Sequence, residues 1–74
     1  MPKLPVIAPR QLISALNKIG FFEHRQHGTS HLVLKHPDGR RAIVPMHNKD
    51  IPKGTLLGIL RDCEINKQQL IDLL

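Results

Sequence analysis

Two turn signals, separated by six residues, constrain the fold of this 74-residue chain more than any other feature. Gly28-Thr29-Ser30 and Pro37-Asp38-Gly39 both have the composition of tight turns. Between them lie residues 31–36, HLVLKH, which are rich in strand-forming side chains. Residues 21–27 and 40–46 flank the two turns with stretches of similar length. The pattern predicts three successive strands in an antiparallel sheet.

The register of the second hairpin depends on the length of its loop. A two-residue Asp-Gly loop would pair Lys35 with Ala42, whereas a Pro-Asp-Gly loop with Gly39 in the left-handed region would pair Lys35 with Arg41. The second register collects an apolar set on one face: Leu32, Leu34, Ala42, Val44 and Met46. The opposite face then carries His31, Val33, Lys35, Arg41 and Ile43. We expect this register, because a sheet covered on one side separates apolar from polar residues. It creates a like-charged pair that a bound anion would offset.

Helical patterns stand on either side of the predicted sheet. Residues 9–19 have apolar side chains at helical spacing, with Pro9 at the start and Gly20 as a stop. Residues 52–62 repeat this spacing, and Asn66 can cap a short last helix. Residues 1–8 are expected to form an extended arm. The predicted architecture is therefore a single α+β domain over residues 1–74, in the order α-β-β-β-α with a short C-terminal helix.

Charge and composition restrict the classes of partner. The net charge of +5 and the pI near 10.0 favour a polyanionic partner such as RNA, DNA or an acidic protein. Phe21 and Phe22 are the only aromatic residues among Phe, Tyr and Trp, which argues against base-stacking sheets of the RRM or OB kind. Cys63 is the only cysteine and is expected in the core. With no apolar run of membrane-spanning length and no signal peptide, the sequence predicts a cytoplasmic protein without a membrane partner.

The histidines fit two familiar kinds of site poorly. His24, His27 and His31 have no common zinc spacing, and successive strand residues alternate between faces. Ser30 beside His31 resembles a nucleophile and its base, but no nucleophile elbow surrounds it. We therefore expect neither a metal site nor a hydrolase triad.

His31 has a third interpretation, as a general acid or base. Imidazole exchanges protons near neutral pH, and RNA cleavage by its own 2′-OH requires such transfers. The same region carries candidate RNA-binding groups: the backbone and hydroxyl groups of Gly28, Thr29 and Ser30, and the cations Lys35, Arg40 and Arg41. An exposed strand histidine beside a few cations is also an ordinary surface, and the residues alone leave both interpretations open.

Three stretches resemble the HicA family, the mRNA interferase toxins of bacterial HicA–HicB toxin–antitoxin modules. They are "LISALNKIGF" at 12–21, "GTSHLVLKHPDGRRAIVPMH" at 28–47 and "KDIPKGTLLGILRDCEI" at 49–65. The resemblance implies a fold like a double-stranded-RNA-binding domain, with His31 as the catalytic histidine. It also implies cleavage of mRNA without a metal or cofactor, and a HicB antitoxin that covers the active site. Pro45 and His47 match the family's Pro-x-His, but the match assigns His47 no role.

We therefore expect a small basic endoribonuclease toxin in which His31 transfers a proton. Two alternatives from other classes remain at this point. One is an RNA-binding module of the same fold without catalysis, and the other is a protein-interaction module whose basic face serves only an acidic partner. Binding of RNA without cleavage would indicate the first, and absence of RNA binding at low salt would indicate the second.

Overall fold

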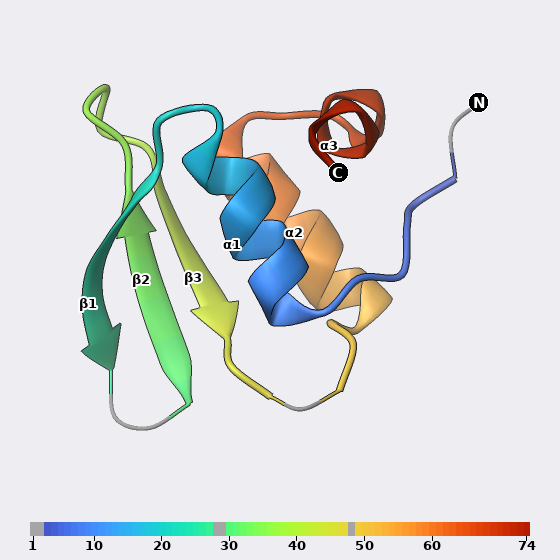
Figure 1. The fold of residues 1–74 in the computed structure, drawn as a ribbon, viewed down its shortest axis with the longest axis horizontal. Helices are drawn as coiled ribbons and strands as arrows, with labels where there is room; N and C mark the ends of the chain where they lie inside the picture. Colours follow the sequence, from blue (N-terminus) through green and yellow to red (C-terminus); the bar gives the residue numbers. More distant parts are fainter. Residues whose placement is uncertain (1–2, 28–29, 48) are drawn as a thin grey trace.

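A three-stranded antiparallel sheet, covered on one face by helices, forms the frame of the protein (Figure 1). The computed structural model describes residues 3–27, 30–47 and 49–74. The elements follow in the order α1 (Pro9–Asn17), β1 (Phe22–His27), β2 (His31–Lys35), β3 (Arg41–Pro45), α2 (Lys53–Cys63) and α3 (Lys67–Leu73). The strand order is β1-β2-β3. The predicted α+β layout is confirmed.

The β2–β3 hairpin has the register that face separation predicted. Lys35 lies opposite Arg41, and Gly39 has a φ of +100°. The N–H of His36 donates to the carbonyl of Arg40 at 2.9 Å, and that of Gly39 donates to the carbonyl of His36 at 2.9 Å. Only glycine adopts this φ without strain, so Gly39 sets the loop length and, with it, the pairing of the strands.

The core lies between the sheet and the helices. Its buried strand residues are Leu32, Leu34, Ala42 and Val44, with Met46 partly buried against them. Cys63 is fully buried in the same cluster, as predicted. The opposite sheet face is exposed at His31, Arg41 and Ile43, which retains 47% of its accessible surface, whereas Val33 on the same face is only 6% exposed. Functional side chains on this face are therefore held by a rigid apolar layer behind them.

Several element boundaries differ from the sequence prediction by one or two residues. Helix α1 ends at Asn17 rather than at residue 19, because Gly20 (φ +101°) reverses the chain and the Phe21 N–H donates to the Leu16 carbonyl at 3.1 Å. Strands β1, β2 and β3 are each shorter than predicted, and α2 begins and ends one residue later. A register shift between Glu23 and Arg25 makes His24 an extra residue of β1, a bulge that periodicity did not predict.

The N-terminal segment is tied to the rest of the fold. Ile7 is only 2% exposed, and its carbonyl accepts a hydrogen bond from the N–H of Ile51 at 2.9 Å. This contact fixes the chain immediately before α2. At the other end, Asn66 caps α3 as predicted: its side-chain oxygen accepts the N–H of Gln69 at 2.8 Å. None of the helices in the described parts of the chain is long and apolar enough to cross a membrane.

Candidate active site

His31 stands exposed at the first position of β2. The hydroxyl of Ser30 lies 3.2 Å from its Nδ1, which restricts the rotation of the ring and leaves Nε2 free for a second contact. The carbonyl of Ser30 accepts the N–H of Met46 at 2.7 Å, and His31 lies opposite Pro45 in the β2–β3 ladder. The backbone of His31 is therefore held by β3 while its side chain faces solvent.

A hollow of about 400 Å³ opens beside His31. It is lined by His31, Ile43, Pro45, His47, Pro52 and Thr55. These residues come from the start of β2, the second half of β3, the following loop and the first turn of α2. The hollow thus combines two imidazoles, one hydroxyl and an apolar floor.

The first turn of α2 contributes a favourable potential for an anion. Pro52 is the N-cap residue, and no described side chain caps the helix. The first N–H groups of a helix have no acceptor within the helix, and the helix dipole adds partial positive charge there. No acidic residue lies in this turn, and Lys53 occupies the first helical position. A phosphate in the hollow would meet complementary charge at this wall.

Lys35 and Arg41 lie on the same sheet face as His31 but at a distance from it. They are partners at the far end of the ladder, Lys35 partly buried and Arg41 exposed. Lys35 is four residue steps along β2 from His31, which corresponds to about 13 Å. Neither cation lines the hollow. The structure therefore does not bring these two cations together with His31 in one hollow.

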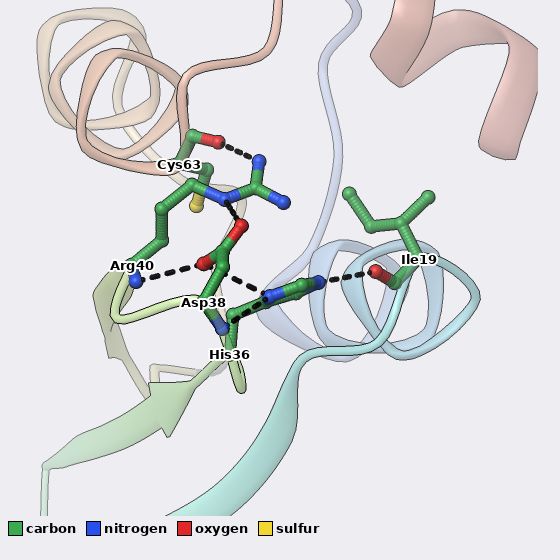
Figure 2. A network of polar contacts seen from close by, with 5 residues as sticks. All are labelled: Ile19, His36, Asp38, Arg40 and Cys63. Carbon is green, nitrogen blue, oxygen red and sulfur yellow. Dashed lines mark hydrogen bonds and ion pairs between the residues drawn. The ribbon is translucent and has the colours of Figure 1, made fainter.

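Arg40, which the sequence grouped with these cations, belongs to a different contact network (Figure 2). Its Nη1 donates to the carbonyl of Cys63 at 2.6 Å, and its Nε donates to Oδ2 of Asp38 at 2.8 Å. The guanidinium also lies 5.2 Å from the centre of the Phe21 ring. Arg40 therefore satisfies the C-terminal end of α2, a structural role. Its predicted contact with RNA gains no support from this geometry.

His36 and Asp38 complete this network around the hairpin loop. Nε2 of His36 lies 2.9 Å from the carbonyl of Ile19, which can only accept, so this nitrogen carries the proton of the bond. Nδ1 accepts the N–H of Asp38 at 3.1 Å, and the same nitrogen lies 2.9 Å from Oδ1 of Asp38. The backbone N–H of Arg40 donates to Oδ1 at 3.0 Å and holds the pKa of Asp38 below its usual value. The network joins the hairpin loop to α1 and α2.

The structure places the remaining candidates as follows. Ser30 contacts His31, as described, whereas Gly28 and Thr29 lie outside the described residues. Among the described residues, no group of three or more His, Cys, Asp or Glu is placed to hold a metal ion. His47 and Thr55 line the hollow although sequence reasoning gave neither a role. The one sequence signal for His47 was the Pro-x-His spacing after β3.

A protein-family model matches most of the chain. Residues 9–65 match a family model described as "HicA toxin of bacterial toxin-antitoxin". The matched range runs from the start of α1 past the end of α2 and includes every residue that lines the hollow. No curated protein sequence matches the chain.

Proposed function

We propose, from the premise that this chain belongs to the HicA toxin family of bacterial toxin–antitoxin systems, that it is an endoribonuclease that cleaves mRNA. The family supplies the toxin role and an antitoxin as partner. The proposal adds a reaction: His31 transfers a proton as general base or general acid during attack of a 2′-OH on the adjacent phosphate. No metal ion or cofactor takes part in the proposed step, and an mRNA target would place this action in the cytoplasm.

The observation that carries the proposal is the placement of His31. Its ring is exposed, contacts the hydroxyl of Ser30 and lines a hollow to which the N-terminal turn of α2 also contributes. A phosphate in this hollow would lie between a proton carrier and a positive helix end. Such preorganised groups stabilise the charge that develops on phosphate oxygens in the transition state.

The remaining candidates have roles in RNA binding under this proposal. Ser30 orients His31, and the contact of Gly28 and Thr29 with RNA stays a prediction from the sequence. Lys35 and Arg41 contact a flanking phosphate on the open sheet face. A HicB-type antitoxin would inhibit by covering the hollow and this face, and the positive charge of the chain would favour an acidic surface on the antitoxin.

Substitution of His31 tests the proposal. Purified His31→Ala should lose cleavage of a defined mRNA by at least about 100-fold, the usual contribution of a general acid or base. Its thermal midpoint should stay near that of the wild type, because the side chain is exposed. His24→Ala is the matched control, since His24 is exposed on β1 and does not line the hollow.

Three results would contradict the proposal. Cleavage by His31→Ala at the wild-type rate would remove His31 from the reaction. Loss of wild-type cleavage in excess EDTA would contradict metal independence. RNA binding by the wild type without any cleavage would indicate the non-catalytic RNA-binding module instead.

A further inference from the structure

The hollow beside His31 contains two titratable side chains among its described lining residues, His31 and His47. Its other lining residues are aliphatic, proline or threonine. The proposed reaction moves two protons, one from the attacking 2′-OH and one to the departing 5′-oxygen. A threonine hydroxyl does not exchange a proton readily near neutral pH, whereas imidazole does. The reaction therefore requires a second proton carrier. Among the described lining residues, His47 has the only other imidazole in the hollow.

We propose that His47 is this second proton carrier and forms an acid–base pair with His31. The inference rests on the proposed endoribonuclease function and names a catalytic residue that the family resemblance left without a role. His47 is exposed and stands on the loop between β3 and α2. Its side chain lines the same hollow as His31 and is therefore accessible to a substrate bound there.

The backbone holds the two histidines as neighbours. The hydrogen bond from the Met46 N–H to the Ser30 carbonyl joins the residue before His47 to the residue before His31. It continues the β2–β3 ladder one step beyond the pair of His31 and Pro45. Residues in this diagonal relation on an antiparallel ladder lie about 7–8 Å apart. From backbone positions at that separation, two side chains on one face can both reach a phosphodiester between them.

The proposed step balances with these two groups alone. One imidazole accepts the proton of the 2′-OH while the 2′-oxygen forms a bond to phosphorus. The bond from phosphorus to the 5′-oxygen breaks, and the second, protonated imidazole donates its proton to that oxygen. The products are a 2′,3′-cyclic phosphate and a 5′-OH end, with no water, metal or oxidant consumed. The Thr55 hydroxyl and the first turn of α2 line the place where the charged phosphate would lie.

A leaving-group substitution tests the pair. His47→Gln and His31→Gln are assayed on a short single-stranded RNA and on the same RNA with a bridging 5′-sulfur at the cleaved linkage. The sulfur departs as a thiolate and needs no proton, so loss of the general acid is rescued and loss of the base is not. We expect each variant to lose at least about 100-fold on the normal RNA. We expect the sulfur substrate to restore one of them to near the wild-type rate.

Several outcomes decide the matter. Rescue of either single variant, with the other still inactive, supports the pair and identifies which histidine is the acid. Wild-type activity in His47→Gln, or an equal loss for both variants on both substrates, overturns the inference. His24→Gln should cleave both substrates at the wild-type rate. If the wild type itself does not cleave RNA, the proposed function has failed, whereas a fully active His47→Gln beside an inactive His31→Gln refutes only the role of His47.

Discussion

Alanine at Gly20 should destabilise the protein more than alanine at Gly39. Both glycines have a positive φ, +101° and +100°, which strains any residue with a Cβ. They differ in what a new Cβ would meet. At Gly20 it would lie 2.8 Å from Nε2 of His36, the nitrogen that bonds to the Ile19 carbonyl. At Gly39 it would meet nothing within 4 Å. Gly39→Ala is therefore a matched control for the backbone strain alone.

The expected magnitudes follow from these contacts. A positive φ costs an L-residue about 1–2 kcal/mol in the folded state. Alanine also lowers the conformational entropy of the unfolded chain relative to glycine, which offsets roughly 0.4–1 kcal/mol of that cost. Gly39→Ala should therefore cost about 1 kcal/mol. At Gly20 the partly buried His36–Ile19 hydrogen bond is lost as well, which adds about 1 kcal/mol. A chain of this length has a total stability of about 4–11 kcal/mol, so both variants should fold.

Urea unfolding followed by far-ultraviolet circular dichroism measures both changes, because the chain has no Trp or Tyr for intrinsic fluorescence. Gly20→Ala should lose about 2 kcal/mol of unfolding free energy and Gly39→Ala about half as much. In a His36→Ala background the two alanine variants should cost the same. Equal losses in the wild-type background would refute the reasoning, since the contact with His36 would then carry no free energy.

Two further predictions concern binding and pH. In an inactive His31→Ala background, Lys35→Ala and Arg41→Ala should each lower the salt dependence of single-stranded RNA binding by about 0.7 in the log–log slope, measured by fluorescence anisotropy; an unchanged slope would remove that residue from phosphate contact. The depressed pKa of Asp38 means that its contribution to stability is present above its usual pKa of 3.8 and is lost as the pH falls through the lower folded value. Asp38→Asn should therefore flatten the acid side of the thermal-midpoint profile, and a decline identical to that of the wild type would contradict this.

The sheet was predictable from sequence because two local signals agreed. Gly39 sets the loop, and the apolar residues separate onto one face only when Lys35 pairs with Arg41. Both signals lie within about ten residues of the turn, where the turn type and the alternation of apolar residues determine the register of the two strands. The bulge at His24 was not predictable, because nothing in the local alternation requires an extra residue there.

The site was predictable only in part. His31 stood out because it follows a turn and begins a strand, and the resemblance to a family named its role. The hollow could not be predicted, since it needs the end of β3 and the first turn of α2 to meet beside β2. The contact of Arg40 with α2 was not predictable for a similar reason. Its acceptor, the carbonyl of Cys63, lies 23 residues away and is a backbone atom that leaves no pattern in the sequence.

The contact between Arg40 and Cys63 has a consequence for genetic screens. It holds the C-terminal end of α2, whereas the hollow lies at the N-terminal end, about 16 Å away along a helix of 11 residues. If the loss of this hydrogen bond destabilises the protein, substitution of Arg40 would reduce toxicity through folding alone. A survivor screen would therefore recover Arg40 together with His31. Only measurements of folding and of salt dependence on the purified variants would separate the structural defect from the catalytic one.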